Sequence, residues 1–271
     1  MSGRVEGKIA LITGACRGQG RSHAVLLASQ GADVVITDLE AESEELAETA
    51  RLVEECGRRA VAVTADIRDF DQVKAVADAG YEAFGKVDVV VANAGVSNFA
   101  KTWELTEEQW DLTLDVNVKG VWHTCKSVIP RMIEAGSGGS IVITGSTTSE
   151  RGLIGLGHYA ASKHGVLGLG RSMANELGEY MIRVNLVHPS AVYTPLMTRP
   201  SVYKRMLPHL DNPTLEDYEQ ASAKRHILPV GWVEPIDISH AVLWLASDDS
   251  RFVTGAAIPV DAGMIQKVVG Q

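Results

Sequence analysis

Seven short runs of apolar, largely β-branched residues divide this chain, and longer segments separate them. Each run is almost continuously apolar rather than alternating, which is typical of strands that are covered on both faces of a sheet. The runs span residues 8–13, 33–37, 60–65, 87–92, 140–144, 182–187 and 256–260. We interpret them as about seven β-strands of one sheet.

The segments between these runs have the period of amphipathic helices, near 20–30, 43–56, 70–84, 107–134, 159–179 and 235–246. Two of them begin with capping-box spacing, Asp69 with Gln72 and Thr106 with Gln109. Pro235 stands where a first helical turn tolerates proline. Alternating strands and helices require right-handed crossovers. The pattern therefore predicts an α/β fold with a doubly wound parallel sheet and helices on both faces.

One segment, residues 195–233, breaks this alternation. It is rich in Pro, Met, Tyr and Leu and comes just before the last helix and strand. A long irregular insertion at this place predicts a lid or substrate loop. No repeat or linker divides the remaining chain, so we expect residues 1–271 to form a single domain that carries this insertion.

Composition and charge exclude several classes of protein. The 271 residues carry a formal net charge of −9 with no basic stripe, so we expect no nucleic-acid partner. The three cysteines, Cys16, Cys56 and Cys125, lack metal-ligand spacing, which predicts a reducing compartment and no metal site. There is no apolar stretch of membrane-spanning length and no signal peptide. We therefore expect a cytoplasmic protein with no membrane partner.

A glycine-rich turn, Gly14-Ala-Cys-Arg-Gly18-Gln-Gly20, follows the first strand and opens the first helix. Glycines at such a turn let the backbone approach a pyrophosphate, which the N–H groups and the positive end of the helix dipole then hold. The spacing differs from the more common GxGxxG fingerprint. By itself the turn would equally serve to pack the helix closely on the strand.

Asp38, at the end of the second strand, supports the dinucleotide interpretation. A carboxylate there accepts hydrogen bonds from the adenosine ribose hydroxyls and repels a 2′-phosphate, which favours NAD over NADP. Arg17, within the glycine turn, points the other way because it would pair with a 2′-phosphate. We give the carboxylate more weight, and the alternative for Arg17 is a solvated surface charge.

Tyr159 and Lys163 are four residues apart and share one face of the expected helix. An ammonium roughly 4 Å from the phenol contributes about 4 kcal/mol at an effective dielectric near 20. That energy would lower the pKa of Tyr159 from about 10 to near 7, where acid/base catalysis is most efficient. The positive charge of an oxidised nicotinamide would help to lower this pKa. The same spacing also arises by chance on many helices.

Two polar residues complete a candidate catalytic set. Ser146 follows the fifth strand, where its hydroxyl would hold a substrate oxygen beside the phenol. Asn117 lies in an apolar part of the long helix 107–134, where it would bind a water that passes protons towards Lys163. The alternative for Asn117 is a buried structural amide that binds the backbone.

Six polar or turn-forming residues stand near the carboxyl ends of successive strands: Gly14, Asp38, Asp66, Asn93, Ser146 and Pro189. Ligands bind along that edge in open α/β sheets. The pattern therefore predicts one cleft that combines the glycine turn with the catalytic set.

The chain resembles the short-chain dehydrogenase/reductase family from about residue 6 to residue 263. The motifs that match are the glycine turn, Asn93-Ala94-Gly95, Asn117, Ser146, and Tyr159 with Lys163. The resemblance implies a Rossmann fold in which Tyr159 is the acid/base, Lys163 binds the nicotinamide ribose, Ser146 orients the substrate and Asn117 supports a proton relay. The cofactor-binding residues that it implies are Gly14, Arg17, Gly18, Gln19, Gly20, Asp38, Leu39, Asp66, Ile67, Asn93, Ala94, Gly95, Tyr159, Lys163, Val192 and Thr194.

His188-Pro189-Ser190 departs from the family's usual Asn-Pro-Gly, and Gln19 replaces a usual aliphatic residue. Three segments, 18–24, 203–213 and 228–235, resemble the actinobacterial carveol dehydrogenase branch. That branch implies NAD that stays bound through turnover, an apolar secondary alcohol such as a terpenoid, and a mycofactocin-type electron acceptor. The wider family implies a homotetramer.

The insertion 195–233 offers an apolar lid suited to such an alcohol, with Met197, Tyr203, Met206, Leu207, Leu210 and Trp232. Leu153, Ile154 and Leu156 would form the facing wall, although all of these residues fit a core or a subunit interface equally well. We therefore expect an NAD-dependent oxidoreductase that interconverts an alcohol and a ketone. An NADPH-dependent carbonyl reductase and a non-catalytic NAD sensor remain alternatives, while a serine hydrolase is disfavoured because GxSxG is absent from the sequence.

Overall fold

The computed structural model describes residues 3–268 and contains one seven-stranded sheet in the order β3-β2-β1-β4-β5-β6-β7. Every neighbouring pair of strands is parallel. The strands are β1 (Ile9–Thr13), β2 (Asp33–Asp38), β3 (Ala60–Thr64), β4 (Val89–Ala92), β5 (Gly139–Thr144), β6 (Ile182–Pro189) and β7 (Ala257–Val260). The predicted doubly wound parallel sheet is confirmed.

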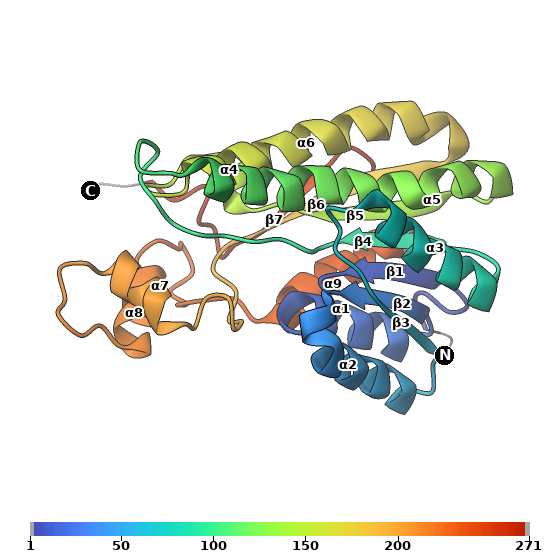
Figure 1. Ribbon diagram of the computed structural model, residues 1–271, viewed down its shortest axis with the longest axis horizontal. Helices are drawn as coiled ribbons and strands as arrows, with labels where there is room; N and C mark the ends of the chain where they lie inside the picture. Colours follow the sequence, from blue (N-terminus) through green and yellow to red (C-terminus); the bar gives the residue numbers. More distant parts are fainter. Residues whose placement is uncertain (1–2, 269–271) are drawn as a thin grey trace.

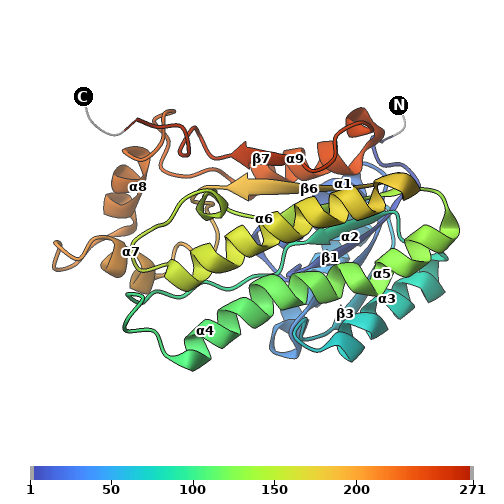
Figure 2. The same cartoon turned by 90° about the horizontal axis from the view of Figure 1, so that it is seen from above.

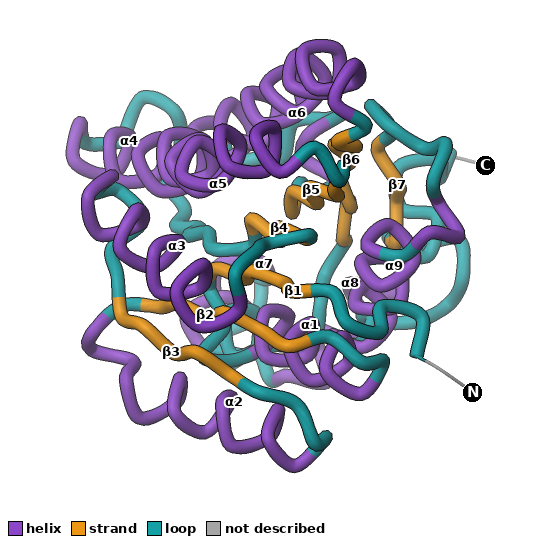
Figure 3. The backbone as a smooth tube through the Cα atoms, turned by 90° about the vertical axis from the view of Figure 1, so that its right-hand side faces the viewer, coloured by secondary structure: helices purple, strands orange, loops and turns teal. Residues whose placement is uncertain are grey.

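Helices cover both faces of the sheet (Figure 1 and, seen from one end, Figure 3). One face carries α1 (Gly18–Ser29), α2 (Ser43–Glu55) and α9 (Pro235–Ala246), and the other carries α3 (Phe70–Phe84), α4 (Glu107–Leu114), α5 (Val121–Ala135) and α6 (Gly157–Leu177). Strand residues alternate between two cores, so that Ile12 packs towards α1 while Leu11 packs towards α5. This arrangement explains why the strand sequences are continuously apolar.

The predicted helix 107–134 is not a regular α-helix throughout. A π-helical segment, Asp115–Gly120, joins α4 to α5 and carries Asn117. A π-bulge inserts one extra residue into the helical turn and frequently occurs at functional sites. Sequence periodicity does not reveal it, because the hydrophobic pattern continues on both sides.

The insertion 195–233 contains two short helices that the sequence analysis missed, α7 (Pro200–Met206) and α8 (Leu215–Ala223). Both carry start signals, since Pro200 occupies the first turn of α7 and Thr214 forms a capping box with Asp217 at α8. Figure 2 shows both helices beyond the ends towards which the β6 and β7 arrows point. The insertion therefore lies at the carboxyl edge of the sheet.

The insertion has a small core of its own. Val202, Leu207 and Tyr218 are buried, and several partly buried residues pack against them. These residues include Met197, Tyr203, Met206 and Trp232. Most of the residues expected to line a lid thus pack against one another within the insertion. Within residues 3–268, no helix is both long and apolar enough to cross a membrane.

Candidate active site

The ends of β1, β4 and β5 are joined at the carboxyl edge by Asn93. Its side-chain amide donates to the carbonyl oxygens of Thr13, at 3.1 Å, and Gly14, at 3.2 Å. The Thr144 hydroxyl donates to the Asn93 carbonyl oxygen at 3.2 Å. The Thr13 hydroxyl in turn accepts the backbone N–H of Asn93 and of Ala94, each at 3.1 Å. Hydrogen bonds therefore hold together the strand ends at the edge where the sequence predicted a binding cleft.

The glycine turn allows a close approach between β1 and the turn after β4. Gly14 has φ +68°, and a Cβ there would lie 2.7 Å from the Ala94 Cα. A Cβ on Gly20 would lie 2.0 Å from the Gly14 carbonyl oxygen. Helix α1 begins at Gly18 without a side-chain cap, so its first N–H groups remain available to an anion. Thr194 lies beside this region, because its methyl group would be 3.2 Å from a Cβ on Gly18.

Asp38 lies beside the turn, where the sequence placed it. Its Oδ2 accepts the backbone N–H of Cys16 at 3.0 Å, and its Oδ1 accepts that of Leu39 at 2.9 Å. Arg17, expected either to meet a phosphate or to be solvated, instead forms an ion pair with Glu42. Both side chains of that pair remain partly exposed. Sequence reasoning did not anticipate Glu42 as the partner of Arg17.

Asp66 and Ile67 follow β3 and were expected at the adenine. The Asp66 carboxylate binds the Arg68 guanidinium, with Nε to Oδ2 at 2.9 Å, and this contact lowers the pKa of Asp66. Ile67 is buried against Gly120 on the π-helical segment. The adenine contacts of both residues stay a prediction.

Helix α6 directs Tyr159 and Lys163 to the same edge. Lys163 is only 3% exposed, and its Nζ donates to the Thr144 carbonyl at 2.7 Å. The same Nζ lies 5.7 Å from the centre of the Tyr159 ring. Ser146 is buried, its hydroxyl accepts the Thr148 N–H at 3.1 Å, and it lies close enough to the Tyr159 hydroxyl to lower the pKa of that phenol. The structure thus brings all three predicted side chains together.

The electrostatics differ from the expectation in one respect. Burial raises the pKa of Tyr159, and the Ser146 hydrogen bond opposes that rise. Burial also lowers the pKa of Lys163 to about 8. The expected fall of the phenol pKa to near 7 is therefore wrong for the chain alone. Desolvation of the phenol is the largest effect on its pKa, and the ammonium donates to the Thr144 carbonyl, so burial outweighs the attraction of the charge.

The side chain of Asn117 binds neighbouring parts of the protein. The amide accepts the Val96 N–H at 2.8 Å and donates to the Val96 carbonyl and the Ser162 hydroxyl, each at 3.0 Å. The structural-amide alternative is therefore correct for the side chain. A Cβ on Gly95 would lie 3.2 Å from the Asn117 Oδ1 and 3.7 Å from the Lys163 Nζ, so these residues adjoin.

Two residues depart from the usual Asn-Pro-Gly motif, His188 and Ser190. Each lies beside a residue that sequence reasoning missed. His188 is fully buried against Gly145, and its Nδ1 lies 3.4 Å from the Glu150 carboxylate. Burial lowers the pKa of His188. The Ser190 hydroxyl lies 3.1 Å from the Nε2 of His226, a buried residue near the end of the lid. These pairs connect the end of β6 with the segment after β5 and with the insertion 195–233.

Only some of the residues expected to line a substrate site are buried. Leu156 is buried and bridges to Ala100, whereas Ile154 is 96% exposed. Leu210 is exposed at the lid surface. The Arg205 guanidinium of α7 lies over the Phe99 ring, 4.8 Å from its centre, and so ties the lid to the loop after β4. A parallel β-bridge between Val192 and Val233 joins the two ends of the insertion.

Comparisons with known proteins agree with this geometry. A family profile described as enoyl-(acyl carrier protein) reductase matches residues 14–265. The chain belongs to the short-chain dehydrogenase/reductase family. The family resemblance predicted from the sequence is therefore confirmed.

Individual relatives are similar over nearly the whole chain. A (-)-trans-carveol dehydrogenase of Rhodococcus erythropolis is 44% identical over 97% of this chain and 99% of its own. The crystal structure of carveol dehydrogenase from Mycobacterium avium in complex with NAD is 46% identical, with a TM-score of 0.95 over 98% of this chain and 100% of that one. A short-chain dehydrogenase of Mycobacterium paratuberculosis, solved bound to NAD, is 42% identical, with a TM-score of 0.88 over 98% and 100% of the two chains.

Proposed function

We propose that this protein is an NAD-dependent dehydrogenase that oxidises an apolar, terpenoid-like secondary alcohol to the ketone and catalyses the reverse reduction. The convergence of Ser146, Tyr159 and Lys163 beside the glycine turn carries this proposal. The relatives named carveol dehydrogenase support both the cofactor and the class of alcohol.

The dinucleotide fits the chemistry of the cleft. The uncapped start of α1 and the absence of Cβ atoms at Gly14 and Gly18 leave backbone N–H groups open to a pyrophosphate. Asp38 offers carboxylate oxygens to the ribose hydroxyls. When bound, the oxidised nicotinamide supplies the hydride acceptor. We assign the remaining cofactor contacts to the residues that the family motifs mark, including Val192 and Thr194 at the carboxamide.

In this mechanism Ser146 holds the substrate oxygen and Tyr159 takes the hydroxyl proton as the alcohol is oxidised. Lys163, held on the Thr144 carbonyl, keeps a positive charge near the phenol and is positioned to bind the nicotinamide ribose. Since the Asn117 side chain is fully engaged, we assign its relay role to the π-helical backbone around it, which would hold a water close to Lys163. The hydroxyl group of the alcohol then loses its proton, and the carbon that bears this hydroxyl loses the hydride.

The whole chain acts, in this proposal, as one catalytic domain with residues 195–233 as its substrate lid. The protein functions as a cytoplasmic homotetramer, and all three cysteines are free, as a reducing compartment favours. A mycofactocin-type carrier would reoxidise a cofactor that stays bound between turnovers.

The absorbance of reduced nicotinamide tests the function directly. Purified protein is mixed with carveol and other cyclic secondary alcohols, first without and then with added NAD. We expect the absorbance to grow with secondary alcohols and to stay flat with a matched tertiary alcohol, which has no carbinol hydrogen to transfer. Ketone reduction with NADPH but not NADH would instead identify a carbonyl reductase, and binding without any turnover would identify a sensor.

A further inference from the structure

Three carboxylates gather at the end of β2 where the adenosine ribose would bind. Asp38 ends the strand, and Glu40 and Glu42 belong to the 3-10 turn that follows it. The Glu40 carboxylate accepts the Thr64 hydroxyl, whereas the Glu42 carboxylate binds the Arg17 guanidinium. The three acids therefore have different partners.

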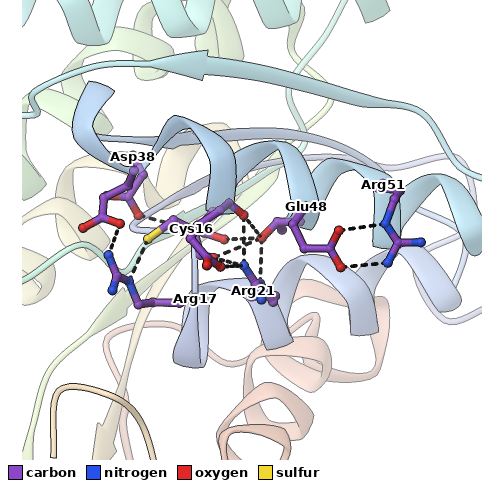
Figure 4. A network of polar contacts seen from close by, with 10 residues as sticks. Cys16, Arg17, Arg21, Asp38, Glu48 and Arg51 are labelled. Atoms are coloured by element: carbon purple, nitrogen blue, oxygen red, sulfur yellow. Dashed lines mark hydrogen bonds and ion pairs between the residues drawn. The ribbon is translucent and has the colours of Figure 1, made fainter. Parts of the chain in front are cut away.

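Arg17 is tied into a chain of contacts that ends at Asp38. Its Nε donates to the Cys16 sulfur at 3.4 Å, and the backbone N–H of Cys16 donates to Asp38 Oδ2 at 3.0 Å. Figure 4 shows Cys16 and Arg17 next to Asp38, at the mouth of the glycine turn. The guanidinium thus lies within reach of a group attached to the ribose, and Glu42 holds it.

The second arginine of this region, Arg21, already has hydrogen-bonding and ion-pair partners. Arg21 pairs with the Glu45 carboxylate at 2.5 Å and donates to the Thr49 hydroxyl at 2.9 Å. It also donates to the backbone carbonyl of Cys16. These contacts brace the glycine turn itself. Arg17 is therefore the cation of the turn that a ribose phosphate would recruit.

We propose that Glu42 is a specificity-determining residue, which occupies Arg17 and so prevents the site from using that arginine to bind a 2′-phosphate. The inference rests on the proposed nucleotide site and extends it beyond Asp38. A 2′-phosphate would have to displace Glu42 from Arg17 and then lie between two carboxylates. An NAD ribose carries no such charge and leaves the ion pair intact.

Equilibrium binding of NADH and NADPH to the nucleotide-free protein tests this role, with Glu42→Gln as the variant. We expect NADPH to bind about tenfold more tightly to the variant and NADH to bind within about twofold of its original affinity. Glu40→Gln is the matched control, because it removes the same charge from the same turn without touching Arg17. We expect it to change either affinity by less than about twofold.

A double-mutant cycle with Arg17→Gln separates release of the arginine from a general loss of negative charge. The gain in NADPH affinity should disappear when Glu42→Gln is made in the Arg17→Gln background. Persistence of the gain there, an equal gain in Glu40→Gln, or no gain in Glu42→Gln would overturn the proposal. Because no alcohol is present, a failed substrate assignment leaves this readout intact, whereas failure of the parent protein to bind NADH would refute the nucleotide site itself.

Discussion

Lys163 combines two requirements that oppose each other, burial and positive charge. The side chain is nearly inaccessible, and its Nζ donates to the Thr144 carbonyl at 2.7 Å. Burial disfavours the charged form and lowers the pKa of Lys163 to about 8. The active site therefore keeps its ammonium at a cost in stability, as functional sites commonly do.

This cost predicts an unusual pH dependence of folding. Because the pKa of Lys163 is lower in the folded state than in the unfolded chain, unfolding takes up protons above pH about 8, and this group's contribution to stability rises with pH from there to about 10.5. Between pH 8 and about 9.5 the rise is on the order of 1–2 kcal/mol. Urea unfolding of wild type and Lys163→Met at both pH values should show this increment in the wild type alone. Equal pH responses would refute it.

Tyr159 carries the proton transfer, so Tyr159→Phe should lower kcat by about a hundredfold or more, while the affinity for NADH stays within about twofold. The phenyl ring keeps the shape of the site and removes only the hydroxyl. Steady-state kinetics together with nucleotide binding measure both effects. Tyr180→Phe, which removes the same atom from the 3-10 turn after α6, is the control and should keep full activity. A near-normal kcat for the Tyr159→Phe enzyme would contradict the proposed mechanism.

At the scale of elements, the end of β6 links the segment after β5 to the insertion 195–233. His188 packs by Gly145 and near Glu150, in the segment that carries Ser146. Ser190 lies beside His226, whose Nδ1 is 2.6 Å from the Val230 carbonyl at the end of the lid. The residues that depart from the family's Asn-Pro-Gly thus connect the catalytic loop and the lid to one strand.

Ser190→Ala should loosen the lid without altering the catalytic groups. The substitution leaves the buried His226 Nε2 without its hydrogen-bonding neighbour, which destabilises the contact between β6 and the insertion. We expect KM for the alcohol to rise about threefold to tenfold, with kcat and NADH affinity nearly unchanged. Ser190→Thr keeps the hydroxyl and should restore the lower KM. A parallel fall of kcat, or no rescue by threonine, would place Ser190 elsewhere in the mechanism.

At the scale of the whole molecule, α4 and α5 present large apolar side chains to solvent. Trp110, Leu112 and Trp122 are each between 37% and 42% exposed. Trp122 also lines a shallow hollow with Leu114, Val118 and Leu169 of the neighbouring helices. Exposed large apolar side chains on these helices favour contact with a second copy of the chain, which agrees with the proposed tetramer.

Trp122→Glu tests this assignment, because a carboxylate buried at a subunit contact would be unpaired. We expect light scattering after size-exclusion chromatography to show a tetramer for the wild type and a smaller species for the variant. Trp103→Glu is the control, since Trp103 is 80% exposed in the loop before α4 and should leave the mass unchanged. A monomeric wild type, or a tetrameric Trp122→Glu protein, would refute the interface.

Features that depend on local sequence were predictable. Continuous apolar runs specified the strands, because both faces of each strand are buried. Strand direction then placed the glycine turn, Asp38, Asn93 and Ser146 at one edge. The helical period put Tyr159 and Lys163 on one face of α6, as the structure confirms.

Tertiary structure decided everything that depends on partners far apart in the chain. The hydrogen bonds of Asn117 to Val96 join residues far apart in the chain, and Arg17 meets Glu42 only because β2 brings the acidic turn beside the glycine turn. The raised pKa of Tyr159 follows from burial, which spacing along a helix does not reveal. Periodicity reports which face of an element is buried, whereas desolvation and pairing depend on what the finished fold places against that face.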